Sequence, residues 1–193
     1  MDVFEAIKGR RSVGKTRLES PTRAQIEELL AMAVHAPNHH LTEPWRFFVL
    51  AGEARAQLGQ IMQENLREKM SETTSEKALA ALAKEHYKPL RAPVLIVVAS
   101  KHTPDSKAEE IEDLEATAAA TQNILLAAHA MGLATVWRTG DAAYNQRVKA
   151  WLGLEPKDHI VGIVYVGYPA MLVSEREQPA FANKTQWWGW PEE

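Results

Sequence analysis

The chain of 193 residues contains no cysteine, and it has no HExxH pattern. The first absence excludes disulfides, thiolate nucleophiles, iron–sulfur clusters and cysteine-ligated zinc. The second excludes the commonest zinc-protease motif. Any redox activity would therefore need a bound organic cofactor, or a metal held by histidine and carboxylate side chains.

Long apolar runs are also missing. None approaches the roughly 20 residues that a membrane-spanning helix needs, and the opening MDVFEAIKGRRS lacks the apolar core of a signal peptide. We therefore expect a cytoplasmic protein. The formal net charge of −3 gives no general attraction to nucleic acid or to an anionic membrane. With 46% hydrophobic and 24% charged residues, the chain should fold in water as one domain over residues 1–193.

The segment 108–140 carries the strongest helical pattern. Its acidic opening suits a helix N-terminus, which favours negative charge. Apolar and small residues then surround the helix on nearly all sides up to Met131, which indicates burial on more than one face. Gly132 is a candidate C-terminal cap, and 133–137 is a predicted strand that ends in a turn at a sheet edge or cleft.

Other segments have simpler patterns. Continuous apolar runs predict central strands, and a third strand is rich in aromatic and β-branched residues. The central strands are expected at 94–99 and 160–169, the third strand at 45–50, and helices at 2–8, 22–35, 53–66 and 145–152. Residues 67–87, rich in charge and alanine, are interpreted as a peripheral segment and a candidate lid.

The loop after the first predicted helix is basic. It contains Arg10, Arg11, Ser12, Lys15 and Arg17. Two guanidinium groups beside a hydroxyl can bind phosphate, because arginine offers a planar fork of donors to phosphate oxygens. A solvated basic loop without a ligand is the alternative interpretation.

Three histidines lie at the end of the second predicted helix and just after it: His35, His39 and His40. The spacing of the first two could suggest a metal site, but Pro37 lies between them and breaks the helix that would align their rings. We therefore predict no metal site, and expect hydrogen bonds to a ligand or to the loop backbone. Near the C-terminus, Trp187, Trp188 and Trp190 should pack on the same subunit or on a partner.

Four motifs together, in this order and spacing, resemble the nitroreductase family of flavin-dependent oxidoreductases over almost the whole chain. They are Arg10-Arg11-Ser12, Ala36-Pro37 followed by Glu43-Pro44-Trp45-Arg46-Phe47, the alanine-rich helix before Gly132-Leu133, and Val136-Trp137-Arg138-Thr139-Gly140. Within the family, the chain is similar to the small single-domain bacterial NAD(P)H nitroreductases.

The resemblance implies an α+β fold with a central mixed sheet flanked by helices. It also implies an intertwined homodimer with a C-terminal arm and two FMN sites at the interface. The implied activity is FMN-dependent oxidation of NADH or NADPH. Nitroaromatic or quinone-type electrophiles would be reduced by ping-pong hydride transfer, without a catalytic side chain.

The same resemblance assigns roles to individual residues. Arg10, Arg11 and Ser12 match the group that holds the FMN phosphate and ribityl chain. His35 and His39 match flavin contacts from the partner subunit, and Trp137, Arg138 and Thr139 match the turn along the isoalloxazine or phosphate end. The nicotinamide nucleotide is assigned to Ala127, Ala128, His129, Ala130, Met131 and Gly132.

The chain departs from the family pattern at two positions. Many relatives have asparagine at the position of Leu41 and glutamine at that of Glu43, so flavin hydrogen bonds there must be replaced or absent. Lys184 is the only nearby candidate for a C-terminal basic residue at the phosphate. No Rossmann-type glycine fingerprint indicates NADH or NADPH. The alternatives are a flavin-binding protein without catalysis, for storage or sensing, and a cofactor-free binding module.

Overall fold

Four strands form one sheet in the order β1-β2-β4-β3. The computed structural model describes residues 1–104, 106–172 and 179–191. The strands are β1 (Trp45–Ala51), β2 (Val94–Ser100), β3 (Ala134–Arg138) and β4 (His159–Gly167). Every residue of β2 is buried, as is most of β4. The two apolar runs are therefore the central strands that their composition predicts.

All three pairings between these strands are antiparallel. The α+β class is confirmed. The mixed character expected of the sheet is not found among the four strands. Within the described part of the chain, parallel pairing is limited to an isolated bridge between Ser12 and Thr135. The physical reason is that the N-terminal loop runs along β3 but pairs with it at this one bridge, so it does not add a strand.

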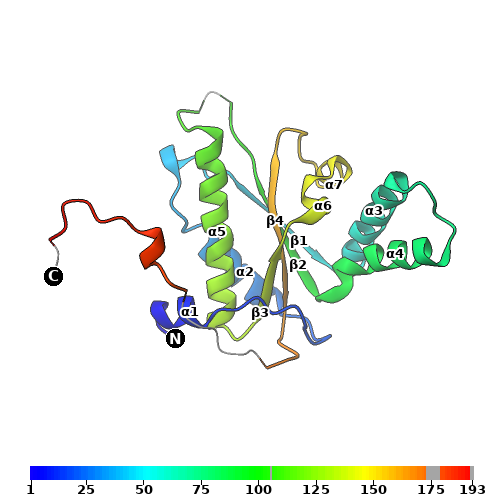
Figure 1. Cartoon of the computed structure of the whole chain (residues 1–193), viewed down its shortest axis with the longest axis horizontal. Helices are drawn as coiled ribbons and strands as arrows, with labels where there is room; N and C mark the ends of the chain where they lie inside the picture. Colours follow the sequence, from blue (N-terminus) through cyan, green and yellow to red (C-terminus); the bar gives the residue numbers. More distant parts are fainter. Residues whose placement is uncertain (105, 173–178, 192–193) are drawn as a thin grey trace.

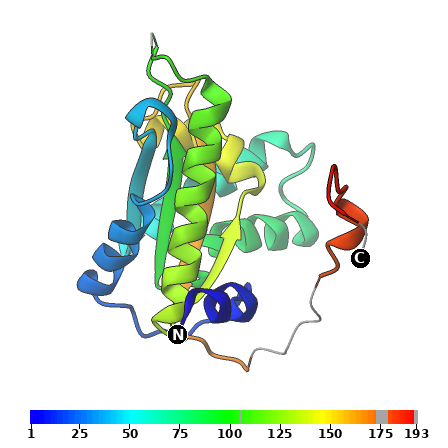
Figure 2. The same ribbon diagram turned by 90° about the vertical axis from the view of Figure 1, so that its left-hand side faces the viewer.

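One face of the sheet is covered by α5 (Glu110–Ala130) and α2 (Arg23–Ala33), with α1 (Val3–Gly9) beside the end of α5. Figure 1 shows α5 as a long column over the sheet, and Figure 2 shows it in front of the strands with α1 at its lower end. Ala120, Ile124 and Ala128 of α5 are fully buried. The helix is thus a central element, as its alanine-rich sequence predicts.

The opposite face is covered by α3 (Glu53–Lys69), α6 (Gly140–Tyr144) and α7 (Gln146–Trp151), while α4 (Glu76–Tyr87) packs on α3. Alternate residues of β2 pack on the two sides: Ile96 faces the α2–α5 layer, whereas Leu95 and Val97 face the layer that contains α3. The sheet therefore lies between two layers of helices (Figure 1).

The helix starts follow their capping residues. Asp2 caps α1 and Thr22 caps α2, and each forms a reciprocal capping box with the residue three positions later. Three short 3-10 helices complete the fold: η1 (His39–Leu41), η2 (Lys88–Arg91) and η3 (Ala182–Lys184). None of the helices that the structure describes is long and apolar enough to span a bilayer.

The candidate lid region 67–87 forms the end of α3, a bend and α4. Leu82 of α4 is buried, and Gly59 of α3 lies directly against the His86 backbone. The two helices therefore form a packed hairpin at the edge of the molecule (Figure 1). The idea that this hairpin closes over a substrate stays a prediction.

Candidate functional site

The basic N-terminal loop lies alongside the edge strand β3. The Val13 N–H donates to the Thr135 carbonyl at 2.8 Å, next to the bridge between Ser12 and Thr135. A Cβ atom on Gly14 would lie 3.6 Å from a terminal nitrogen of Arg138. The loop that carries Arg10–Ser12 thus runs along the strand that ends in Trp137–Thr139, although 125 or more residues of sequence separate the two groups.

Arg10 and Arg11 lie close to His129 in the last turn of α5. Burial, followed by the positive charges of Arg10 and then Arg11, lowers the His129 pKa below its usual value of 6.5. There is little free space, because a Cβ atom on Gly9 would lie 2.7 Å from His129 Nε2. The neutral imidazole can coexist with the two guanidiniums, whereas a third positive charge there would be repelled.

The guanidinium of Arg11 is held at one terminal nitrogen by backbone carbonyls. Its Nη1 donates to the carbonyls of Lys8 at 2.6 Å and Arg10 at 2.9 Å. Its Nε is buried and has no hydrogen-bond partner in the structure. A buried donor that makes no hydrogen bond lowers folding stability, so an acceptor that reached this nitrogen would be stabilising.

Trp137 and Arg138 end β3 and lie on opposite faces of the sheet, Trp137 with the α2–α5 layer and Arg138 with the opposite layer. The indole Nε1 of Trp137 donates to the Val161 carbonyl at 3.1 Å, and the ring occupies the space that a side chain on Gly162 would need. The guanidinium of Arg138 lies 5.6 Å from the centre of the Tyr165 ring, in cation–π range. Burial raises the Tyr165 pKa, so this phenol stays neutral at ordinary pH.

A cavity of about 270 Å³ opens beside Arg138 and Thr139. Its other walls come from α3, α4, η2, α6 and β4, and they include Met62, Glu85, Lys88, Arg91, Gly140, Asp141, Ala142, Ile163 and Tyr165. Three cationic side chains and two carboxylates therefore border it, with Lys88 paired to Glu85 at 2.5 Å. The turn after β3 lies at a sheet edge and beside a cavity, as the sequence predicts.

His39 lies at the other end of α5. Its Nδ1 is 2.9 Å from a carboxylate oxygen of Glu112 in the first turn of the helix, and the pair borders an open groove with Asn38 and Glu115. Seventeen residues separate Glu112 from His129, which corresponds to about 25 Å along an α-helix. The structure does not bring His39 to the arginines of its own chain.

His35 lies in a different groove from His39. The His35 groove is formed by α1, α2 and the C-terminal half of α5, with Val3, Met32, Leu126 and Ala127 among its walls. Both histidines are exposed to solvent. The side of the α2–α5 layer that they border is therefore open in the single chain.

The segment assigned to the nicotinamide nucleotide, 127–132, is the end of α5. Gly132 has φ of +73°, and the Leu133 N–H donates to the Ala128 carbonyl at 2.8 Å, which closes the helix. Ala128 is fully buried. Among these residues, His129 is the one that the structure places beside the phosphate-binding candidates; the nucleotide assignment itself stays a prediction.

The departures from the family pattern lie at the end of η1, which contains Leu41, and in the loop after it, which contains Glu43. Leu41 is 84% exposed, and both Leu41 and Glu43 have positive φ. Lys184 lies in η3 of the C-terminal segment, whose described residues 179–191 stand apart from the sheet and helices (Figures 1 and 2). Trp188 is 87% exposed, so the tail does not pack on its own subunit at this residue.

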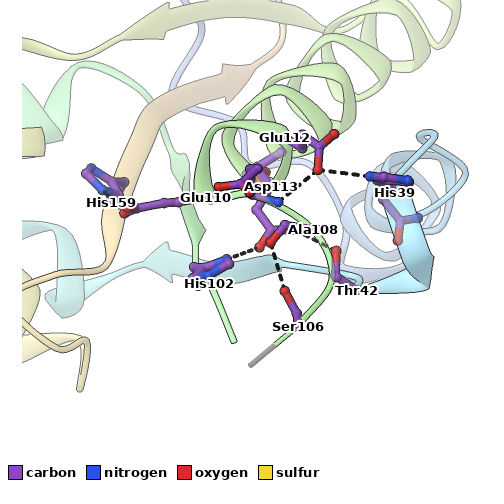
Figure 3. A network of polar contacts seen from close by, with 12 residues as sticks. His39, Thr42, His102, Ser106, Ala108, Glu110, Glu112, Asp113 and His159 are labelled. Carbon is purple, nitrogen blue, oxygen red and sulfur yellow. Dashed lines mark hydrogen bonds and ion pairs between the residues drawn. The ribbon is translucent and has the colours of Figure 1, made fainter. Parts of the chain in front are cut away.

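Sequence reasoning missed two parts of the site. The first is the set of Lys88, Arg91 and Tyr165 on the cavity wall. The second is a buried network around Asp113, which Figure 3 shows between His102 and Thr42. The helical period did hold a signal for Asp113, because it shares the face of Thr117 and Ala120 that the alanine-rich pattern buries.

Comparison with known proteins identifies the family. The sequence model of the nitroreductase family matches residues 7–168. "Putative NAD(P)H nitroreductase YdjA" of Escherichia coli K12 is 29% identical over 174 residues, which cover 90% of this chain and 92% of that protein. The crystal structure of a nitroreductase-like family protein from Bacillus cereus has a TM-score of 0.81 and 29% identity, and covers 98% of this chain and 97% of that one.

A further solved structure shares the fold at lower identity. It is a putative nitroreductase from Desulfovibrio desulfuricans in complex with FMN, with a TM-score of 0.73 and 24% identity, covering 99% of each chain. The family match spans both halves of the site, from the N-terminal loop to β4. The chain belongs to the nitroreductase family.

Proposed function

We propose that the protein is an FMN-dependent NAD(P)H oxidoreductase that reduces nitroaromatic or quinone-type electrophiles. The observation that carries the proposal is that the loop with Arg10, Arg11 and Ser12 lies along β3, and β3 ends in the Arg138–Thr139 turn beside a cavity. The names of the relatives support it, since YdjA is named for NAD(P)H and the Desulfovibrio protein is a complex with FMN.

The residues present fit an FMN phosphate. Arg11 has a buried Nε without an acceptor, and it lies with Arg10 and a neutral His129 near the exposed Ser12 hydroxyl. Phosphate oxygens would provide the missing acceptor, and arginine pairs with them through charge-assisted hydrogen bonds. Arg10, Arg11 and Ser12 would hold the phosphate and ribityl end, and Trp137, Arg138 and Thr139 would border the ring.

We also propose that two copies of the chain complete each site. His39 is about 25 Å from the arginines along α5, so His39 and the arginines cannot contact the same FMN molecule within a single chain. The exposed apolar side chains of Val3, Phe4 and Ile7, together with the open grooves at His35 and His39, support a partner on this face.

When bound, FMN supplies the redox chemistry, accepting a hydride from NADH or NADPH and then passing electrons to the electrophile. The protein supplies charge and position. Arg138, Lys88 and Arg91 place positive charge at the cavity, where it stabilises negative charge that develops during reduction. NADH or NADPH and the electrophile would occupy the same cavity in turn, which is a ping-pong order. No side chain needs to act as a nucleophile.

An absorption spectrum of the purified protein, before and after anaerobic addition of NADPH, tests this function. We expect a flavin spectrum that NADPH bleaches and that a quinone then restores. A flavin spectrum that NADPH does not bleach would instead support a storage or sensing protein. A colourless protein that takes up no FMN on incubation would contradict both, and would support the cofactor-free module.

A further inference from the structure

The loop that carries His39 has an unusual backbone. His40, Leu41 and Glu43 have φ values of +51°, +54° and +43°, in the left-handed region that residues with side chains rarely adopt. In the described part of the chain, every other residue with positive φ is a glycine. Three such residues within four positions are costly, so surrounding contacts must hold this conformation.

Two consecutive carboxylates in the first turn of α5 hold the loop. The Thr42 hydroxyl donates to Asp113 Oδ1 at 2.6 Å, and His39 Nδ1 lies 2.9 Å from Glu112 Oε2. Figure 3 shows the side chains of His39 and Thr42 pointing toward the first turn of α5. Within the loop, the Glu43 N–H also donates to the Asn38 side chain at 3.0 Å.

Asp113 differs from an ordinary acidic residue at a helix start, because its side chain is only 1% exposed. Its second oxygen, Oδ2, lies 2.7 Å from His102 Nδ1, in the loop after β2 (Figure 3). Both carboxylate oxygens are therefore occupied, one by the His39–Glu43 loop and one by the β2–α5 connection. A buried carboxylate is stable only with such partners, so its geometry is fixed from two sides.

We propose that Asp113, acting through Thr42, is a positioning residue that holds the strained loop and thereby orients His39 toward bound flavin. The inference rests on the proposed function, which assigns His39 to the flavin site of the partner subunit. The hydrogen bond from His39 to Glu112 fixes the ring, and the bond from Thr42 to Asp113 fixes the backbone that carries it.

The test is Thr42→Val in the full-length chain, which removes the hydroxyl but keeps the side-chain volume. We expect amide hydrogen exchange of residues 40–43 in the flavin-free protein to accelerate, and the Kd for FMN to rise about tenfold, as for loss of one hydrogen bond to a charged group. Thr42→Ser, which keeps the hydroxyl, should restore both values.

Thr121→Val is the matched control. It removes one buried hydroxyl that donates to the Thr117 carbonyl inside α5, without contact to the loop. Both variants should lower thermal stability, but Thr121→Val should leave the Kd for FMN unchanged. If the wild type and Thr42→Val bind FMN equally well, the role proposed for Asp113 is overturned, but the proposed function is not. A wild-type protein that binds no FMN would overturn the proposed function, and with it this role.

Discussion

His129 lies near two guanidiniums, so its pKa should report on the phosphate site proposed at Arg10 and Arg11. Its folded pKa lies below 6.5 because of burial and the charges of Arg10 and Arg11. When the pH falls below 6.5, the unfolded chain takes up the proton before the folded chain does, so folding stability falls with pH toward the folded pKa. A bound phosphate would reverse the sign of the local charge and raise the His129 pKa.

We therefore predict that FMN raises the His129 pKa and weakens this loss of stability. NMR titration of the histidine ring protons, with and without FMN, measures the shift directly. Urea unfolding of the flavin-free protein at about pH 7.5 and about pH 5.5 measures the free energy of unfolding at each pH. Between the two, the wild type should lose more of this free energy than His129→Gln. His159, which pairs with Glu110 at the other end of α5, is the internal control. A His129 pKa that FMN leaves unchanged would place the phosphate elsewhere.

Arg10→Ala should raise the Kd for FMN by about tenfold or more, because the variant loses a charge-assisted hydrogen bond to the phosphate. Fluorescence titration of the flavin-free protein and the flavin content after purification measure the change. Arg23→Ala is the matched control, since Arg23 is 92% exposed on α2 and its ion pair is with Glu27. Equal flavin content in the two variants would remove Arg10 from the site.

At the scale of elements, the α3–α4 hairpin depends on one glycine. Gly59 is buried within α3, and a Cβ atom there would collide with the His86 backbone carbonyl of α4. Glycine to alanine inside a helix normally stabilises by about 1 kcal/mol. Here the His86 carbonyl belongs to the backbone and cannot rotate away as a side chain could. The collision should therefore outweigh the gain in helix propensity, and Gly59→Ala should lower folding stability.

Gly59→Ala should destabilise the protein by about 1–3 kcal/mol through overpacking. Because Met62 and Glu85 border the cavity, the shift of α3 against α4 should also lower kcat/KM for electron transfer. Urea unfolding and steady-state rates measure the two effects. Gln57→Ala, at an exposed position of the same helix, should change neither. A Gly59→Ala protein that is more stable than the wild type would show that the helices can separate without cost.

The elements that sequence predicts well are those whose local pattern is complete. The apolar runs of β2 and β4 and the patterns that predict the helices at 2–8 and 22–35 are local signals, and the structure confirms them. Helix α4 lay inside a segment interpreted only as charged and peripheral. Its buried side chains, Ala78 and Leu82, are too few to give a strong helical stripe.

The site is less local, and its prediction came from family resemblance. No pattern within the chain indicates that Ser12 meets Thr135, or that His102 and Thr42 share Asp113, because these contacts depend on how strands and helices are ordered in space. The basic loop could equally be solvated on its sequence alone. Its proximity to Arg138 distinguishes it from an ordinary surface loop.

For the whole molecule, the exposed aromatic tail implies a partner. Trp187, Trp188 and Trp190 are 66%, 87% and 67% exposed, and within the described residues the first and last contact each other at 5.6 Å between ring centres. Each tryptophan can bury roughly 150–250 Å², so leaving three in water is unfavourable. The face of α1, α2 and α5 offers exposed apolar side chains to receive a second copy.

We predict that the protein is a dimer at micromolar concentration, and that replacing Trp187 and Trp188 by serine shifts it toward monomer. Light scattering after size-exclusion chromatography measures the mass. Because each FMN site is proposed to need His39 of the partner subunit, the variant should lose flavin in parallel with the dimer, and its flavin content should recover as protein concentration rises. Leu18→Ser, at a fully exposed apolar position outside the tail, should leave both mass and flavin content unchanged. A monomeric wild type that holds one FMN per chain would contradict the two-chain site, since His39 and Arg10 lie too far apart in one copy to contact the same FMN molecule.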